Sequence, residues 1–376
     1  GAEMDEKISP LFSTVYLVLL YLSIGPLFAI PRTATVSFTT GITPFISSNQ
    51  TQLGLFIYTL IFFALVLLFS LRPSKIMTWI GKYINSIFLV LLFCLLVMAF
   101  VKPIGSFTNV QPTGGYISHS FSTGLLEGYN TMDALASLAF AIVLINAIKE
   151  FHIKDAKEIA KITLRSGVLA VALMAIIYFG LTILGAQSVL LQGTSENGGV
   201  ALAILAKHYY DAVGNVLLAG IMIFACLKTA IGLVTSCAET FVEVFPKTVS
   251  YRTYAVGFTL ISFLLSNFGL DRILKYSLPA LLFLYPITIV FIFLLLVGSF
   301  VGENKIIYQS TIIATIIAAF IDTFSKPSYT FMHSAFTEGL VNLYQKLPMY
   351  EIGFAWVIFS LIGFVVGFLL SKMTKK

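Results

Sequence analysis

Residues 127–140, which read EGYNTMDALASLAF, decide how this sequence is interpreted. Two carboxylates, a glycine and several hydrogen-bonding side chains stand directly before an apolar run that continues to Ile148. At membrane depth an unpaired polar group is costly unless it lines a cavity or pairs inside the protein. If the chain lies in a membrane, this polar interruption is therefore a functional hypothesis.

The composition places the chain in a membrane. Hydrophobic residues make up 58% of the 376 residues and charged residues only 11%, whereas soluble domains carry about 25% charged residues. The net charge of +6 comes from cations in short loops, which argues against nucleic-acid binding. No catalytic motif or metal-ligand spacing is present, so the sequence predicts a membrane protein that is not an enzyme and needs no cofactor.

Ten apolar segments are long enough to cross about 30 Å of hydrocarbon. We expect an all-α, multi-pass protein in which residues 1–376 form one transmembrane domain. The expected spans are 11–31, 53–71, 84–101, 118–148, 163–186, 212–238, 251–269, 273–299, 306–323 and 352–371. In the last span, Gly363 and Gly367 form a small-residue motif suited to close helix packing, within the chain or between two copies.

Loop charges predict the orientation, because cytoplasmic loops carry an excess of Lys and Arg. Fifteen cations stand in one set of loops and six in the alternating set. The fifteen are Lys7, Arg72, Lys75, Lys82, Lys149, Lys154, Lys157, Lys161, Arg165, Lys247, Arg252, Lys305, Lys372, Lys375 and Lys376. Ten spans with both termini in the cytoplasm, in the plasma membrane, fit this bias.

Segment 118–148 is too long for one straight span. We expect an outer half-helix, an unwound turn at Gly128–Asn130 and an inner half-helix that starts near Thr131. Asp133 is then either an anchor in the first turn of the second half, where the helix dipole favours a carboxylate, or part of a gate. Glu127 has no comparable structural explanation.

Two other segments contain polar or helix-breaking residues. Segment 11–31 ends in GPLFAIPRT, where Pro26 and Pro31 interrupt the backbone ladder and Arg32 either reaches the outer face or acts as a gate cation. In segment 212–238, Lys228 falls near the middle, where a charge needs a partner or water.

The same segment also carries a possible ion site. Gly232, Thr235 and Ser236 share one helix face and offer oxygens to a hard cation such as Na⁺. The alternative is that the two hydroxyls bond to carbonyls of their own helix or to a packed neighbour.

Three motifs resemble the branched-chain amino acid:cation symporters of the BrnQ type. They are YLSIGPLFAIPRT at 21–33, EGYNTMDALAS at 127–137 and TAIGL at 229–233. The resemblance runs over essentially the whole chain. It implies a secondary transporter that imports leucine, isoleucine and valine with Na⁺ through a lipid bilayer, on a LeuT-like scaffold of two inverted five-helix repeats.

The resemblance also implies roles for individual residues. Glu127, Gly128, Tyr129 and Asn130 are expected to line the substrate pocket, with Tyr21, Ile24 and Gly25 opposite. Gly232, Thr235 and Ser236 match the segment that supplies sodium ligands in LeuT-like folds, and Arg32, Asp133 and Lys228 are expected to gate or to pair charges.

The sequence departs from the family pattern in two ways. Family members begin with two further helices, and the first of these holds the substrate's carboxylate and ammonium, so we expect half of the site to be absent here. Lys228 stands where a threonine is expected. Its ammonium either replaces the ion and shifts coupling towards protons or pairs with Glu127. The rival functions are thus a proton-coupled transporter and a membrane amino-acid sensor or partner-binding subunit that does not transport.

Overall fold

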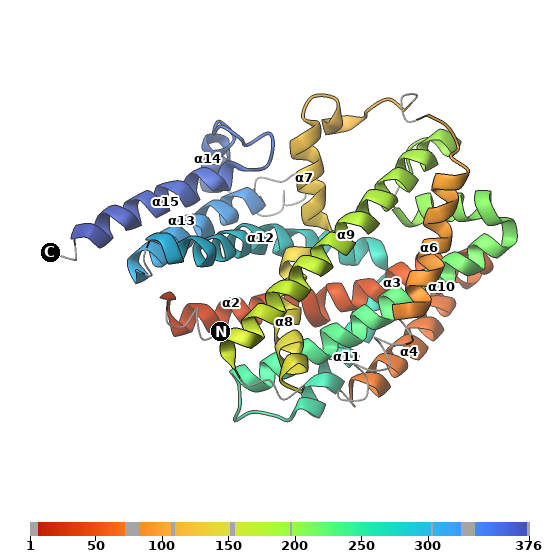
Figure 1. Cartoon of the computed structure of the whole chain (residues 1–376), viewed down its shortest axis with the longest axis horizontal. Coiled ribbons are helices and arrows are strands. Elements are labelled where there is room, and N and C mark those ends of the chain that lie inside the picture. The colour runs from red at the N-terminus through yellow and green to blue at the C-terminus, as the bar shows by residue number, and fades with distance from the viewer. Residues whose placement is uncertain are drawn as a thin grey trace. The chain divides into compact units, whose positions relative to one another are not determined.

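A computed structural model describes residues 7–71, 83, 85–106, 110–150, 155–195, 198–301, 304–324 and 335–373. Within these residues the protein is helical and contains no strand (Figure 1). The prediction of an all-α protein is confirmed. The chain divides into two compact units, one formed by residues 1–24, 113–139 and 274–376 and the other by residues 25–112 and 140–273.

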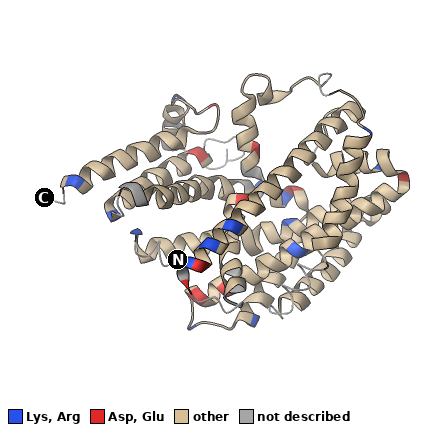
Figure 2. Ribbon diagram, in the orientation of Figure 1, with Lys and Arg blue, Asp and Glu red and all other residues tan. Residues whose placement is uncertain are grey.

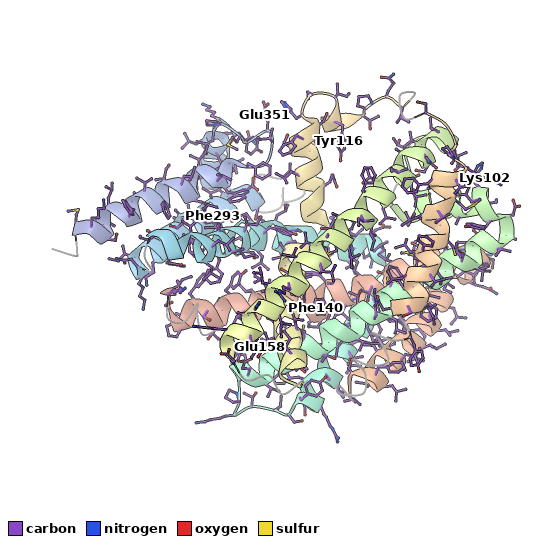
Figure 3. The ribbon with its side chains drawn as sticks, viewed as in Figure 1. Lys102, Tyr116, Phe140, Glu158, Phe293 and Glu351 are labelled. Carbon is purple, nitrogen blue, oxygen red and sulfur yellow. The ribbon has the colours of Figure 1, made fainter. Side chains whose placement is uncertain are left out.

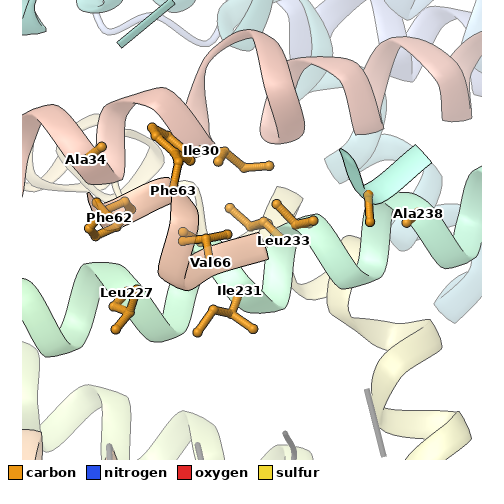
Figure 4. Close-up of a cluster of buried hydrophobic side chains, with 12 residues drawn as sticks. Ile30, Ala34, Phe62, Phe63, Val66, Leu227, Ile231, Leu233 and Ala238 are labelled. Atoms are coloured by element: carbon orange, nitrogen blue, oxygen red, sulfur yellow. The ribbon is translucent and has the colours of Figure 1, made fainter. Parts of the chain in front are cut away.

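The second unit is organised around α10. Its helices are α3 (Ala29–Gly41), α4 (Thr51–Ser70), α6 (Asn85–Val101), α9 (Ala156–Gln192), α10 (Gly198–Val244) and α11 (Tyr251–Ser266). All the others pack against α10. Figure 4 shows a buried apolar cluster in this unit, in which Ile30 of α3, Phe62 of α4 and Ile231 of α10 are almost fully enclosed.

The long helix α10 is broken at Asp211, whose φ of 49° and ψ of −131° are not helical. The chain approaches itself closely at this break, because a Cβ on Gly214 would overlap the carbonyl group of Ala206. Only glycine fits there. The expected span 212–238 therefore corresponds to the second arm of α10, which begins directly after the break.

The first unit contains α2, α7 and most of the C-terminal half of the chain. Its helices are α2 (Pro10–Leu22), α7 (Ser120–Asn130), α12 (Leu270–Val301), α13 (Lys305–Phe324), α14 (Ala335–Tyr344) and α15 (Ala355–Met373), with α8 (Asp133–Glu150) and α12 crossing the boundary between the units. Tyr16 of α2 and Thr288 of α12 share a buried hydrogen bond of 2.5 Å.

The packing of α13 on α15 explains the two glycines of the last span. A Cβ on Gly363 would lie 2.7 Å from the carbonyl oxygen of Ser310, and one on Gly367 would overlap the Ser310 hydroxyl. The small-residue motif therefore makes an intramolecular contact between two helices of the same unit.

Seven helices of the described chain are long and apolar enough to cross a membrane, and an eighth span is obtained if α11 and residues 270–277, bent by 113°, are counted together. The expected segments 84–101 and 118–148 fall short, since one is a helix of 17 residues and the other is broken into α7 and α8. Charged side chains are few, and long stretches of helix carry none of them, as Figure 2 shows. The protein is thus a multi-pass membrane protein.

One predicted boundary is wrong. The first span does not end at Pro31, because α3 continues to Gly41 and the apolar stretch Pro10–Phe45 forms one candidate span. Pro31 is the third residue of α3, and a proline in the first turn of a helix removes an N–H group that has no helical acceptor. The proline therefore lies within the start of a helix and does not end one.

We predict that Gly363→Ala destabilises the protein, because its Cβ meets backbone atoms of α13 that can move little. The expected loss is about 1–3 kcal/mol, typical of overpacking. Gly257→Ala on α11 is the matched control, since a Cβ there meets nothing within 4 Å, and it should raise stability by about 0.5–1 kcal/mol. Thermal unfolding of the purified variants in detergent measures both. A higher melting temperature for Gly363→Ala would contradict the packing argument.

Candidate functional site

The helix break between α2 and α3 lies at Ser23–Leu27, a single π-helical turn that contains Pro26. Gly25 has non-helical angles, with φ −100° and ψ −123°. Pro26 has no N–H group, so the ladder is interrupted and a carbonyl is left without its usual partner. The Ser262 hydroxyl of α11 lies 3.4 Å from the Pro26 carbonyl oxygen while it donates to Phe258 at 2.7 Å. The sequence prediction of a break at these residues is confirmed.

Two glycines bring neighbouring elements against α10. A Cβ on Gly25 would lie 2.6 Å from the sulfur of Cys237, and a Cβ on Gly232 would lie 2.7 Å from the ring of Phe140. Phe140 belongs to α8 and is labelled in Figure 3. Both glycines thus have a packing role, which requires the absence of a side chain. A binding role for either residue remains a prediction.

Thr235 and Ser236 of α10 are buried, with 8% and 0% of their surface exposed. The Thr235 hydroxyl has no hydrogen-bond partner among the described residues. A bond from this hydroxyl to a carbonyl of its own helix, one of the two alternatives to ion binding, is therefore not found for Thr235, whereas Tyr251 of α11 is a packed neighbour of it. An unsatisfied buried hydroxyl costs about 1–3 kcal/mol. The ion-binding role of Thr235 and Ser236 remains a prediction.

The second helix break separates α7 from α8, but it is displaced from the predicted position. α7 continues through Asn130, and the chain unwinds at Thr131 and Met132, where Met132 has a φ of 63°. Gly128 lies inside α7 with open space around it. The turn expected at Gly128–Asn130 is therefore wrong by about two residues. Glycine does not mark the break, because Met132 itself adopts the left-handed conformation.

Asp133 begins α8, as its predicted role as an anchor requires. The Thr131 hydroxyl lies 2.8 Å from the Asp133 carboxylate and 2.7 Å from the Gly128 carbonyl oxygen. The backbone N–H of Ala136 donates to the Met132 carbonyl at 2.8 Å, which starts the helical ladder of α8. A carboxylate in the first turn stabilises a helix through its dipole. Asp133 thus acts locally at the start of α8, and its predicted gating role is untested.

The other expected substrate residues are placed as follows. Tyr21 is buried and its hydroxyl donates to the carbonyl of Ala139 on α8 at 3.1 Å, about two turns after the break. Ile24 is 2% exposed. Glu127 is exposed on α7. The side chains of Tyr129 and Asn130 lie outside the described part of the structure. Tyr21 and Ile24 are thus both part of the packed interior, and their predicted contact with substrate remains a prediction.

Arg32 lies well inside its span, because α3 continues for nine residues beyond it, about 13 Å at 1.5 Å per residue. Its guanidinium is half-buried and lies near Cys226 of α10. This position disfavours the interpretation in which Arg32 sits at the end of a helix. A cation inside a span is a functional candidate.

Lys228 is half-buried in the middle of the second arm of α10. Its ammonium donates to the Asn85 side-chain oxygen of α6 at 2.8 Å and lies 4.1 Å from the centre of the Phe88 ring. Both contacts are with neutral groups. The charge is thus stabilised by a hydrogen bond and by the negative face of an aromatic ring. The sequence analysis missed Asn85, since the pair is 143 residues apart.

A second polar contact that the sequence did not predict joins α4 to α11. The Tyr251 hydroxyl donates to the carbonyl of Ser70 at 2.7 Å. Both residues are hydroxyl-bearing and stand at helix ends, which is the only signal in the sequence. Their separation of 181 residues means that only tertiary packing could reveal the contact.

The chain matches, over residues 1–374, the family described as "Branched-chain amino acid transport protein". It belongs to this family. It is 42% identical over 375 residues to the branched-chain amino acid permease BrnQ of Lactobacillus delbrueckii subsp. lactis. This alignment covers 100% of this chain and 83% of the relative. It is also 37% identical to BrnQ of Bacillus subtilis strain 168, over 99% of this chain and 83% of the relative. No solved structure matches the chain.

The resemblance noted in the sequence is thereby confirmed at the level of the family. The relatives are permeases and carriers, so the expectation that the chain is not an enzyme is confirmed as well.

We predict that Asn85→Leu destabilises the protein because it leaves the Lys228 ammonium without its acceptor. The expected loss is about 1–3 kcal/mol. The double variant Lys228→Met with Asn85→Leu should lose less than Asn85→Leu alone, since both polar partners are removed together. Thermal unfolding of wild type, both single variants and the double variant gives the coupling energy. Strictly additive losses would show that the contact contributes nothing.

Proposed function

We propose that this chain is a secondary active transporter that imports branched-chain amino acids together with a coupling cation by alternating access. The observation that carries the proposal is the near full-length similarity to permeases named for branched-chain amino acids. The two broken helices support it, because transporters commonly bind solutes where helices unwind at membrane depth. A LeuT-like inverted-repeat scaffold is part of the proposal.

The proposed substrates share an aliphatic side chain, which limits how well the transporter can distinguish them. A transporter selects them by burial in an apolar pocket, and one methylene contributes only about 0.8 kcal/mol. Leucine, isoleucine and valine should therefore be poorly separated from one another. On the basis of the family resemblance we assign the pocket to Tyr21 of α2, to Ile24 and Gly25 of the helix break that follows it, and to Glu127, Gly128, Tyr129 and Asn130 of α7.

We propose Na⁺ as the coupling cation, held in part by α10. The buried Thr235 hydroxyl, which has no hydrogen-bond partner among the described residues, supports this assignment. Ser236 is the neighbouring candidate on the basis of the family resemblance. Each positive charge that moves inward gains about 2.3 kcal/mol per 100 mV, which corresponds to about 50-fold accumulation. Coupling to H⁺ is the second candidate, and Lys228 favours it, because a fixed ammonium inside a span can substitute for a bound cation.

The orientation is proposed from loop charge, with both termini in the cytoplasm and the protein in the plasma membrane. Lys207, on the first arm of α10, joins the outer set, whereas Arg32 lies inside its span and leaves that set, so six cations stand against fifteen in the inner loops. The bias therefore remains strong.

Uptake of radiolabelled leucine into proteoliposomes tests the proposal. We expect an inward Na⁺ gradient to raise initial uptake at least tenfold over choline, and unlabelled isoleucine and valine to compete. If an inward H⁺ gradient alone drives uptake, coupling is to protons. Uptake that ignores both gradients would refute coupling, and leucine binding without flux would identify a sensor.

The variant Glu127→Gln tests the substrate assignment in the same assay. We expect it to lower uptake at least tenfold, because the carboxylate is placed on α7 beside the helix break. Glu351→Gln is the matched control, since Glu351 is an exposed carboxylate in the turn before α15, and it should stay within twofold of wild type. Equal uptake by the two variants would remove Glu127 from the site.

A further inference from the structure

One face of α9 carries three cations near the start of the helix. Lys157, Lys161 and Arg165 stand at i, i+4 and i+8, so they share one side of the helix, and all three are exposed (Figure 2). Among the described residues none of these side chains has an ion-pair or hydrogen-bond partner. Glu158, labelled in Figure 3, borders the face. Three cations and one carboxylate leave this end of the face with a net charge of +2.

The opposite side of α9 packs on α6. Leu184 is fully buried in a cluster with Leu95 and Ala99 of α6, and the Gln187 side chain donates to the Ala99 carbonyl at 2.9 Å. Leu184 follows Lys157 by 27 residues, about seven and a half turns, so the two residues lie on opposite sides of the helix. The cations therefore lie on the side of α9 that does not contact α6.

The length of α9 places these cations at the level of the lipid headgroups. The helix has 37 residues and is about 55 Å long, whereas the hydrocarbon layer is about 30 Å thick. The part of α9 after Arg165 contains 27 residues, about 40 Å, and is sufficient to cross that layer. The turns from Lys157 to Arg165 can thus remain outside the hydrocarbon.

The same face continues into the membrane as an exposed apolar surface. Val168, Ala172 and Phe179 follow Lys161 by 7, 11 and 18 residues, which keeps all of them on one side of the helix. Val168 is 64% exposed, Phe179 is 66% exposed, and Ala172 is exposed as well. The face therefore offers positive charge and then apolar side chains, in the order in which a phospholipid presents its phosphate and its acyl chains.

The chemistry of the cations favours an anionic lipid over a neutral one. Lys157 lies in the first turn of α9, where the positive end of the helix dipole disfavours a cation. A phosphate at this place would be attracted by the helix end as well as by the side chains. The guanidinium of Arg165 can hold a phosphate through two parallel hydrogen bonds. Clusters of Lys and Arg at a membrane surface bind anionic headgroups in general.

We infer that Lys157, Lys161 and Arg165 form a binding site for the headgroup of an anionic phospholipid, whose acyl chains lie along the apolar residues that continue this face. The inference requires only that the chain is a membrane protein and does not depend on transport. The proposed orientation places the site in the cytoplasmic leaflet.

Binding of phosphatidylglycerol to the purified 376-residue chain in a neutral detergent, followed by native mass spectrometry, tests the inference. Phosphatidylcholine with the same acyl chains is the neutral lipid for comparison. We expect wild type to bind phosphatidylglycerol at least tenfold more tightly than phosphatidylcholine. The triple variant Lys157→Gln, Lys161→Gln, Arg165→Gln should raise the apparent Kd for phosphatidylglycerol at least tenfold, because the charges that attract the phosphate are removed.

A matched control removes the same charge from other places in the cation-rich set of loops. It is the triple variant Lys247→Gln, Arg252→Gln, Lys305→Gln, in which all three positions are exposed. Its apparent Kd should stay within twofold of wild type. Without lipid the three proteins should melt alike, since every substituted side chain is exposed. Phosphatidylglycerol should raise the melting temperature of wild type and the control but not of the α9 variant.

Three results would overturn the inference. The first is equal binding of the two lipids by wild type, and the second is binding of phosphatidylglycerol by the α9 variant as tight as by wild type. The third is an equal loss in the control variant, which would show that total positive charge and not this face binds the lipid. Inorganic phosphate that displaces the lipid at equal concentration would identify a site for free phosphate and refute the assignment to a phospholipid.

Discussion

Hydrocarbon offers the backbone no hydrogen-bond partner. Wherever a membrane helix unwinds, other groups of the protein must therefore satisfy the backbone groups that are freed. This constraint shapes the structure at three points, Gly25–Pro26, Thr131–Met132 and Asp211. At the first, small groups allow the unwound chain to lie directly on Cys237 of α10. At the second, the Thr131 hydroxyl lies within hydrogen-bond distance of a freed carbonyl and of the acid that starts α8.

α10 receives the first of these contacts and also carries polar residues inside its second arm, namely Lys228 and Thr235. Five helices of its unit pack around it. Polar atoms held by a packed helix keep a fixed geometry, which selective ion binding needs. The neutral partners of Lys228 fit this picture, since Asn85 and Phe88 stabilise the ammonium without cancelling its charge.

Much of the architecture could be predicted because it follows from local chemistry. The apolar segments became helices, and Pro26 beside Gly25 interrupts the helix between α2 and α3. Gly363 and Gly367 marked a close helix contact. Details governed by position within a turn were harder to predict. The sequence predicts that the first span ends at Pro31, although a proline in a first turn is compatible with a helix. It also predicts the second break at Gly128–Asn130, whereas the residue in the left-handed conformation is Met132.

The sequence by itself determined that this protein is a helical membrane protein of the branched-chain amino acid transport family, because hydropathy and the three motifs are properties of contiguous residues. Only the tertiary structure decided which polar groups meet. Lys228 and Asn85 are 143 residues apart, and Ser70 and Tyr251 are 181 apart. No local pattern connects such pairs, because their contact depends on which faces of separate helices pack together. The polar residues of 127–140 could be identified from the sequence, whereas the residues that contact α10 could be identified only from the fold.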